Sequence, residues 1–220
     1  MKNILSPSIL AADFCKLGAE IQASEKGGAE YLHFDVMDGV FVPSISFGMP
    51  VLQSIRKSVN QVVDVHLMIT EPIRYIDEFV KAGADIITVH YEACEDVQAT
   101  INKIKESGVK VGLSICPDTP ASVLFPYADQ VDMFLIMTVH PGFGGQKLIP
   151  ETVEKVAELR TYLNEHNLDT DIEVDGGIYT TNVQNVLEAG ANVIVAGSAV
   201  FKGDAEENAK QMMEILKKYE

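Results

Sequence analysis

The sequence is short of cysteine, of positive charge and of long apolar runs, and each shortage argues against a class of protein. Its three cysteines, Cys15, Cys94 and Cys116, are odd in number and lack Cys-x-x-Cys spacing. Neither a disulfide framework nor a thiolate zinc site is therefore supported. A reducing compartment fits this pattern best, and we expect a cytoplasmic protein.

Positive charge is scarce across the whole chain. The 17 Lys and Arg residues face 32 Asp and Glu residues, which gives a net charge of -15. Proteins that bind the nucleic-acid backbone cluster Lys and Arg to displace counterions from phosphate. We therefore expect no nucleic-acid partner, and the acidic excess is better explained as a contribution to solubility.

No apolar stretch approaches the length of a membrane span. The first residues, MKNILSPSILAADF, hold one Lys and only short apolar runs, interrupted by Ser6, Pro7, Ser8 and Asp13. A secretory leader has a longer uninterrupted apolar region. We therefore expect a soluble protein with no membrane association.

The order of apolar runs predicts the fold. A chain of 220 residues with 47% hydrophobic residues can form either one barrel or two small domains. Short β-branched runs alternate with longer amphipathic runs, as in successive βα units with a parallel sheet. Eight strands are predicted, at residues 4–10, 31–36, 62–68, 85–90, 110–115, 133–138, 171–175 and 192–197.

A small-residue signal recurs between predicted helices and strands, at residues 27–30, 82–85, 107–110 and 189–192. Glycine there is typical of a helix C-cap. No linker interrupts the repeat, and the GxGxxG fingerprint of a doubly wound sheet is absent after the first strand. The sequence thus predicts an α/β fold, a (β/α)8 TIM barrel, as a single domain over residues 1–220.

Polar residues fall at the ends of three predicted strands, where barrels carry their reacting groups. His33 and Asp35 are two apart on one strand, so both face the same side. Asp64 and His66 repeat this spacing on the next strand, and Asp175 ends the seventh.

Each of these residues alone is better explained as a satisfied interior histidine or a helix cap. Together they favour a metal site, because buried carboxylates need a partner to stay charged and two imidazoles lie alongside. We predict that His33, Asp35, His66 and Asp175 bind one divalent cation. Zinc, iron, manganese and cobalt suit such a set about equally.

Three glycine clusters follow three consecutive strands, at residues 140–146, 175–178 and 196–198. Glycine lets backbone N–H groups approach an anion, and the loops after strands seven and eight commonly hold phosphate in barrels. Each cluster alone could be a tight turn, but three together predict a phosphate site. It would rely on backbone dipoles, with Lys147 and Lys202 the nearest basic residues.

Met37, Met68 and Met137 lie at or just after strand ends. Methionine there is more often core filler. The alternative is an apolar wall beside the reacting carbons of a substrate.

A metal beside two carboxylates, with a phosphate anchor, suits proton abstraction next to a carbonyl. The cation would stabilise the enediolate that forms. If Asp35 removes a proton from one face and Asp175 returns one from the other, the stereochemistry at that carbon inverts. The residues therefore favour an epimerase, and no organic cofactor is needed.

Motifs along the whole chain resemble the ribulose-phosphate 3-epimerase family: SPSILAADF, HFDVMDGVFVPSISFG, DVHLMI, AGAD, PGFGGQ, EVDGGI and AGSAVF. The resemblance implies a barrel of the ribulose-phosphate-binding type and an isomerase of the pentose phosphate pathway, in carbohydrate metabolism, which interconverts D-ribulose 5-phosphate and D-xylulose 5-phosphate. It implies Asp35 and Asp175 as the acid/base pair and His33, Asp35, His66 and Asp175 as metal ligands. It also implies a set of substrate-binding residues: Ser8, Met37, His66, Met68, Met137, Gly142, Phe143, Gly144, Gly145, Gly176, Gly177, Gly197 and Ser198.

Two positions depart from the family pattern. Cys116 stands where Asn often precedes Pro, and His140 stands where Asn or Glu is familiar before PGFGGQ. Neither belongs to the metal set, but both could alter which sugar phosphate is preferred.

Three other functions were weighed against this one. D-allulose-6-phosphate 3-epimerase shares all four metal positions, although PGFGGQ and DGGI favour the pentose enzyme. An orotidine-phosphate-type decarboxylase would need a Lys where His66 stands. A non-catalytic phosphate-binding barrel would be expected to lack a ligand or base. For partners, we expect a small-molecule sugar phosphate and a homo-oligomer, either a dimer or a hexamer.

Overall fold

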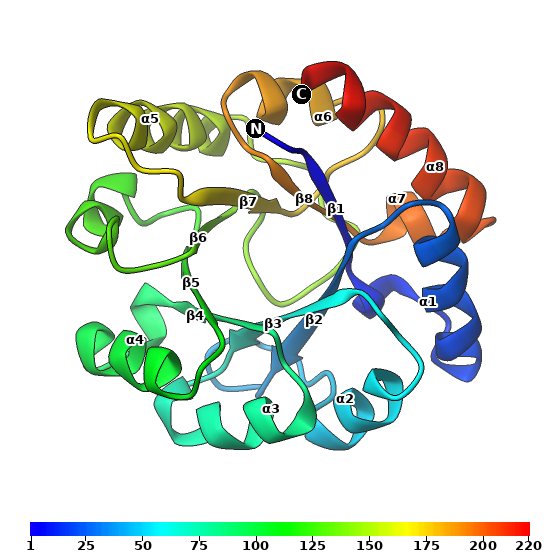
Figure 1. The fold of residues 1–220 in the computed structure, drawn as a ribbon, viewed down its shortest axis with the longest axis horizontal. Coiled ribbons are helices and arrows are strands. Elements are labelled where there is room, and N and C mark those ends of the chain that lie inside the picture. Colours follow the sequence, from blue (N-terminus) through cyan, green and yellow to red (C-terminus); the bar gives the residue numbers. More distant parts are fainter.

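Eight parallel strands surround a central axis and are themselves surrounded by helices in the computed structural model, which describes residues 1–220 (Figure 1). The strands are β1 Ile4–Pro7, β2 Tyr31–Met37, β3 Val62–Met68, β4 Ile86–His90, β5 Lys110–Ile115, β6 Met133–Met137, β7 Asp171–Asp175 and β8 Val193–Ala196. Neighbours in sequence pair in order from β2 to β8, and β8 pairs with β1. A bridge between Ser8 and His33 joins β1 to β2. The predicted (β/α)8 barrel is confirmed.

The helices lie outside the ring (Figure 1). They are α1 Leu17–Lys26, α2 Met49–Arg56, α3 Ile76–Ala82, α4 Val97–Glu106, α5 Glu151–Glu165, α6 Val183–Glu188, α7 Ser198–Phe201 and α8 Ala205–Leu216. A 3-10 helix over Ala121–Tyr127 connects β5 to β6 in place of an α-helix. Pro126 lies within it and has no N–H to donate, which disfavours a regular α-helical turn there.

Glycine ends several helices where the sequence predicted C-caps. Gly83 follows α3 with φ 109, and its N–H donates to the carbonyl groups of Phe79 and Val80. Only glycine adopts this left-handed conformation without strain. The turn redirects the chain into β4, so the repeated small-residue signal does mark the junction from helix to strand.

Alternation along the strands separates a helix-facing core from the barrel interior. On β2, Leu32, Phe34 and Val36 belong to the main apolar cluster of 50 buried residues. His33 and Asp35 face the opposite way, toward the axis. The same period places Val63, Val65 and Leu67 of β3 under the helices, which leaves the interior free for polar groups.

The barrel interior changes from apolar to polar along its axis. Tyr31, Ile86, Met133 and Val193 lie at the strand starts and form a separate buried cluster. Buried polar residues follow further along the strands: His33, Asp64, Thr88 and Glu173, then Asp35, His66 and His90. The apolar layer therefore closes the N-terminal end of the barrel, and the polar groups gather toward the C-terminal end.

Five predicted strands have different limits in the structure: β1 ends three residues early, and β2, β4, β6 and β8 differ by one residue at one or both ends. The first strand ends at Pro7 and not at residue 10, because Ser8 caps a 3-10 turn over Ile9–Ala11 and its side chain accepts from the N–H of Leu10. The second strand runs one residue further than predicted, through Met37.

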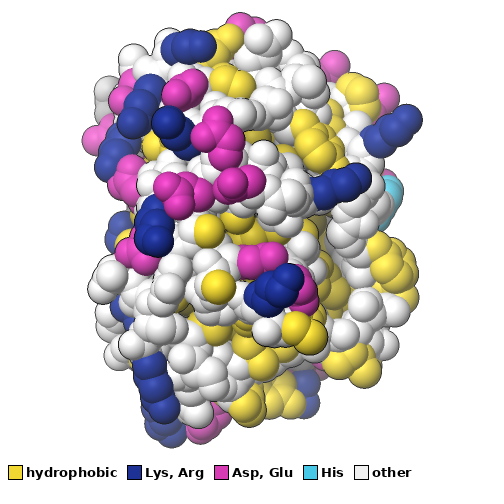
Figure 2. All heavy atoms as spheres, turned by 90° about the vertical axis from the view of Figure 1, so that its right-hand side faces the viewer, with side chains coloured by type: hydrophobic (Ala, Val, Ile, Leu, Met, Phe, Trp, Pro, Cys, Tyr) yellow, Lys and Arg dark blue, Asp and Glu magenta, His cyan; other side chains and the backbone are white.

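Charges of both signs cover the face that carries α1 and α8. Figure 2 shows acidic and basic side chains interspersed there, with hydrophobic side chains gathered lower in the view. Lys2 and Glu30 form one exposed salt bridge. None of the helices combines the length and apolar character needed to cross a membrane.

Candidate active site and metal centre

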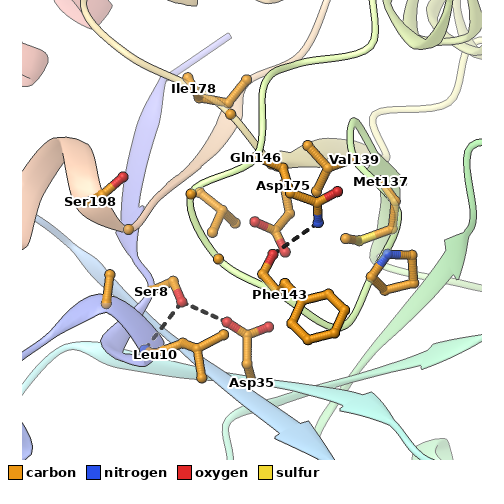
Figure 3. A pocket seen from close by; sticks show the side chains of 18 of the residues that line it. Ser8, Leu10, Asp35, Met137, Val139, Phe143, Gln146, Asp175, Ile178 and Ser198 are labelled. Carbon is orange, nitrogen blue, oxygen red and sulfur yellow. Dashed lines mark hydrogen bonds between the residues drawn. The ribbon is translucent and has the colours of Figure 1, made fainter. Parts of the chain in front are cut away.

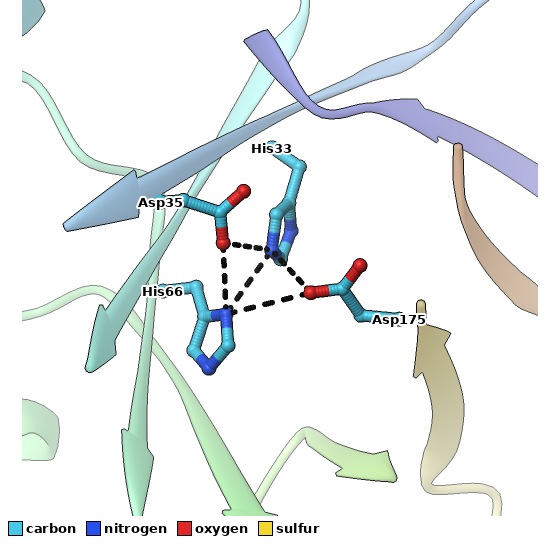
Figure 4. A group of neighbouring side chains, drawn as sticks. All are labelled: His33, Asp35, His66 and Asp175. Carbon is cyan, nitrogen blue, oxygen red and sulfur yellow. Dashed lines mark hydrogen bonds and ion pairs between the residues drawn. The ribbon is translucent and has the colours of Figure 1, made fainter. Parts of the chain in front are cut away.

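Four side chains from three strands converge at the C-terminal end of the barrel (Figure 4). His33 and Asp35 come from β2, His66 from β3 and Asp175 from the end of β7. Register pairs Asp35 directly with His66. Asp35 Oδ1 lies 3.2 Å from His33 Nε2 and 3.1 Å from His66 Nδ1. The predicted cluster therefore exists as a spatial group.

Asp175 completes the cluster from the opposite side (Figure 4). Its Oδ2 atom lies 3.8 Å from His33 Nε2 and 3.9 Å from His66 Nδ1. One donor atom from each of the four residues lies within 4.8 Å of all the others. Two imidazole nitrogens and two carboxylate oxygens at this spacing fit a divalent cation such as zinc, manganese, iron or cobalt.

The two carboxyl groups differ in their affinity for a proton. Burial disfavours charge on Asp35, but the adjacent His33 and His66 outweigh it and hold the Asp35 pKa well below its usual range. Burial and the nearby charge of Asp35 raise the pKa of Asp175 to about 7. Before any cation binds, the site therefore favours one ionised carboxylate and one group that takes up a proton near neutrality.

Sequence reasoning gave no role to two carboxyl groups behind His33. Asp64 Oδ2 lies 2.7 Å from His33 Nδ1, which turns His33 Nε2 toward the cluster. Glu173 Oε1 lies 3.5 Å from the same nitrogen, and burial next to Asp64 raises the Glu173 pKa well above its usual range. Both residues stand two positions before a predicted ligand, so the period-two pattern could have identified them.

His90 and Glu92 also escaped sequence prediction. His90 ends β4 and is fully buried, with Nε2 2.8 Å from His66 Nε2. Burial lowers the pKa of His90 to about 4, so the ring is neutral at pH 7. Burial opposes charge on Glu92, but hydrogen bonds to His90, Thr119 and the backbone of Cys116 lower its pKa to about 2.

A pocket that is open to solvent lies over the cluster (Figure 3). Every predicted substrate-binding residue except His66 lines it: Ser8, Met37, Met68, Met137, Gly142, Phe143, Gly144, Gly145, Gly176, Gly177, Gly197 and Ser198. His66 lies beneath, fully buried. Asp35 and Asp175 are also among the lining residues.

Ser8 connects the pocket to the cluster. Its hydroxyl donates to Asp35 Oδ2 at 2.5 Å, as the dashed line in Figure 3 marks. Oδ1 of the same carboxylate faces His33 and His66. The two oxygens of Asp35 therefore have different surroundings, one at the metal centre and one held by Ser8.

The glycine loops pack closely at the other end of the pocket. A Cβ on Gly177 would lie 2.3 Å from the backbone N of Leu148, and φ at this position is +68. Gln146 Nε2 donates to the carbonyl groups of His140 and Phe143, which ties the loop after β6 together. The lining contains no Lys or Arg, and Lys147 and Lys202, the nearest basic residues in the sequence, are not part of it. An anion here would therefore be held by backbone N–H groups and neutral side-chain donors, without a basic side chain.

Hydroxyl groups stand beside these loops. Tyr179 Oη lies 2.8 Å from Ser198 Oγ, and both residues line the pocket. Tyr179 follows the predicted DGGI segment directly but was not predicted. An aromatic hydroxyl two residues beyond a glycine pair gives no distinct sequence signal.

The methionines form the apolar part of the pocket. Met37 and Met68 are register partners and pack with Val42. Met137 packs with Leu135 and Val139 on the β6 side. All three are buried and still line the pocket, so core packing and pocket lining are both served by the same residues.

The two positions that depart from the family pattern lie outside this pocket. The His140 side chain is 59% exposed, with Nδ1 3.7 Å from Asp118 Oδ2. Cys116 lies behind the pocket, with Sγ 3.6 Å from His90 Nδ1. Burial and the nearby Glu92 raise the Cys116 pKa to about 12, so the group is a neutral thiol at pH 7.

A (β/α)8 barrel with paired carboxyl groups, two imidazoles and a glycine-lined pocket at the C-terminal strand ends defines the class: a barrel enzyme with a potential metal centre in its pocket. Within that class, the chain belongs to the ribulose-phosphate 3 epimerase family, whose model matches residues 4–201. It is an epimerase, and hence an isomerase.

Related proteins support this membership over most of the chain. The ribulose-phosphate 3-epimerase of Bacillus subtilis is 50% identical over 198 residues, which cover 90% of this chain and 91% of that protein. The Synechocystis enzyme of the same name is 51% identical, covering 91% and 88%. The Escherichia coli K12 enzyme is 45% identical, covering 90% and 88%.

Solved structures with low identity share the fold. The 3-keto-L-gulonate-6-phosphate decarboxylase of Vibrio cholerae superposes with a TM-score of 0.76 at 13% identity, covering 100% of both chains. The 3-hexulose-6-phosphate synthase of Salmonella typhimurium also gives 0.76, at 18% identity and the same coverage. At this identity the likeness concerns the barrel alone.

Proposed function

We propose that this chain is a metal-dependent ribulose-phosphate 3-epimerase that interconverts D-ribulose 5-phosphate and D-xylulose 5-phosphate. The observation that carries the proposal is the placement of two carboxyl groups from different strands, Asp35 on β2 and Asp175 on β7, in one pocket. Two acid/base groups on opposite sides of a carbon can invert it, whereas a single base cannot do so efficiently.

Asp35 and Asp175 would exchange the proton at C3. One carboxylate removes it from one face of the sugar, and the other carboxyl group returns a proton to the opposite face. Ser8 holds Asp35 Oδ2 in place during this transfer through its hydroxyl group. The reverse reaction uses the same two groups with exchanged roles.

His33, Asp35, His66 and Asp175 would hold one divalent cation. A cation bound there would supply Lewis-acid stabilisation of the negative charge that develops on the substrate oxygens. Asp64 supports the site by fixing the orientation of His33. The Met37, Met68 and Met137 side chains exclude water from the reacting carbons.

The glycine loops would hold the phosphate group. Gly142 to Gly145, Gly176, Gly177, Gly197 and Ser198 line one part of the pocket, with backbone N–H groups as the available donors. This part would fix the sugar so that C3 reaches Asp35 and Asp175. Fixing the substrate at a distance from the reacting carbon contributes through orientation.

Turnover on two substrates tests the proposal. The purified protein should convert D-ribulose 5-phosphate with a higher kcat/KM than D-allulose 6-phosphate, and solvent deuterium should enter at C3. A preference for the hexose would replace the pentose assignment. Tight binding of either sugar phosphate without C3 exchange would instead support a non-catalytic barrel.

Metal content is tested separately. We expect one divalent cation per chain in protein purified without added metal, measured by elemental analysis. Chelation should abolish epimerisation, and reconstitution with zinc, iron, manganese or cobalt in turn should identify which ion restores it best. Full activity after exhaustive chelation would refute the metal dependence.

We also propose a homo-oligomer, either a dimer or a hexamer. Val40 and Ile45 in the loop after β2 are 76% and 79% exposed, and we propose that contact between copies of the chain covers them. Light scattering of the purified protein would measure the mass directly, and a monomer would contradict the proposal.

A further inference from the structure

The two ring nitrogens of His66 face different surroundings. Nδ1 faces the cluster, 3.1 Å from Asp35 Oδ1 and 3.9 Å from Asp175 Oδ2. Nε2 points away from it and lies 2.8 Å from Nε2 of His90. Two imidazole nitrogens this close form a hydrogen bond, so one carries the proton and the other offers a lone pair.

The direction of this hydrogen bond follows from the metal centre. A cation binds His66 through the Nδ1 lone pair, which leaves the proton on Nε2. His66 Nε2–H therefore donates to His90 Nε2. His90 must then carry its own proton on Nδ1, the nitrogen that lies 3.4 Å from Glu92 Oε2.

Glu92 faces His90, with Oε2 3.4 Å from His90 Nδ1, a nitrogen that also has Cys116 Sγ at 3.6 Å. Its Oε1 atom accepts from the backbone N–H of Cys116 at 2.8 Å and from the hydroxyl of Thr119. These two bonds leave Oε2 toward His90. The side chain of His90 is fully buried, whereas that of Glu92 is 24% exposed.

The rings of His66 and His90 are nearly coplanar, so the orientation of one ring constrains that of the other. Their planes are inclined by 25° and their centroids are 4.9 Å apart. With 2.8 Å between the Nε2 atoms, the rings meet edge to edge. Rotation of His90 would break this contact, so the ring of His90 fixes that of His66.

We propose that His90 and Glu92 are positioning residues that orient the metal ligand His66, in the order Glu92, His90, His66. The inference rests on the proposed metal centre. His33 has the simpler arrangement, with Asp64 Oδ2 2.7 Å from Nδ1. Both ligating imidazoles are then backed by a carboxylate, one directly and one through a second imidazole. Such partners fix the tautomer of a ligand and raise its basicity.

A second cation site is the competing explanation of the same residues. His90, Glu92 and Cys116 bring one nitrogen, one oxygen and one sulfur atom within 4.8 Å of one another. In the proposed hydrogen-bond relay from Glu92 through His90 to His66, however, His90 Nδ1 carries a proton and has no lone pair for a cation. The relay and a second cation on His90 Nδ1 therefore exclude each other while His66 holds the first cation.

Paired substitutions of His90 test the relay. Gln can place an amide acceptor near the position of Nε2, while Met has a similar volume and no comparable acceptor. His90→Met should weaken metal affinity about 10- to 100-fold and speed metal release to a chelator, as is typical when such partners are lost. His90→Gln should stay close to the parent. Glu92→Gln, which keeps an acceptor but loses the charge, should fall between them.

Controls separate the relay from general damage and from the proposed function. Cys116→Ala should release metal at the parent rate, and thermal unfolding of each metal-free variant reports on folding. Cobalt loading should give no thiolate charge-transfer band, because the relay leaves Cys116 without a metal.

The outcomes are distinct. Equal metal release from His90→Met and His90→Gln would overturn the relay, as would a cobalt–thiolate band that Cys116→Ala removes. If His90→Met does not fold, the rate of metal release from Glu92→Gln decides instead. Release from Glu92→Gln at the parent rate would overturn the relay. A parent protein that binds no metal would overturn the metal centre and the relay together, whereas normal metal binding with unchanged variants would overturn the relay alone.

Discussion

The Ser8 hydroxyl donates to Asp35 Oδ2 at 2.5 Å, whereas Asp35 Oδ1 faces the two histidines. Ser8→Ala should therefore lower kcat about 10- to 100-fold, the range expected when a hydrogen bond to a charged group is lost. Metal content should stay at the parent value, because Oδ1 is unaffected. Steady-state kinetics and elemental analysis on the same sample measure both.

Ser6→Ala is the matched control for that variant. Ser6 is also buried on β1, two residues earlier, but its hydroxyl has no hydrogen-bond partner. Its removal should leave kcat unchanged. Equal losses in the two variants would show that Ser8 acts only through packing.

Asparagine at either proposed acid/base position should abolish epimerisation. Asp35→Asn and Asp175→Asn each remove one proton carrier, which contributes roughly 10²- to 10⁴-fold. We expect one of the two variants still to exchange the C3 proton with solvent from a single face, measured by NMR in deuterated water. If both variants epimerise normally, the two-base assignment is wrong. Asp118→Asn, at a side chain that is 87% exposed, serves as the control.

Glu173→Gln should change how stability depends on pH. Burial beside Asp64 raises the folded-state pKa of Glu173 above 4.5, so folding favours the protonated form. The stability that this group contributes is fully present below pH 4.5 and is lost as pH rises through the folded-state pKa. The metal-free variant should therefore unfold at a higher temperature than the metal-free parent at pH 8.

Thermal unfolding across pH checks that expectation. The difference in Tm should reach a few degrees at pH 8, since roughly 1 kcal/mol moves Tm by about 2–4 °C in a domain of this size. It should shrink toward pH 4.5. A difference that is constant with pH would mean that ionisation of Glu173 is not its cause.

Gly177→Ala should impair binding of the phosphate group. The added Cβ would lie 2.3 Å from Leu148 N and 2.9 Å from Gln146 O, so the loops after β6 and β7 must separate. We expect KM for the sugar phosphate to rise about tenfold, equivalent to about 1.4 kcal/mol of binding. Kinetics on the phosphorylated substrate measure it.

Gly108→Ala provides the comparison for Gly177→Ala. Gly108 has φ +80, close to that of Gly177, but a Cβ there meets nothing within 4 Å. This variant carries the backbone strain, on the order of 1 kcal/mol or more, without the clash and far from the pocket. A KM unchanged in Gly108→Ala and raised in Gly177→Ala would assign the effect to the loop contact.

Periodicity explains why much of the fold and the cluster could be predicted. Residues alternate on β2 and β3 between apolar positions under the helices and polar positions toward the axis, and this pattern is visible in the letters. It placed His33, Asp35 and His66 on the axis side. The glycine repeats likewise marked the junctions where helices end, as at Gly83.

The remaining parts depend on contacts between segments that lie far apart in sequence. His90 is connected to His66 only because β3 and β4 are neighbours and register brings their ends together. Glu92 is ordered by the loop of Cys116 and Thr119. The early end of β1 depends on a side-chain cap at Ser8, which competes with strand pairing over a few residues.

The apolar layer of Tyr31, Ile86, Met133 and Val193 fills the N-terminal end of the barrel, so the interior is accessible only from the C-terminal end. A sugar that enters beside the glycine loops cannot pass through, so product must leave by the route that substrate takes in. Substrate and product then compete for one passage, and a bound product blocks the next molecule completely. The rate at which that opening clears sets an upper limit on turnover, however fast the proton is moved.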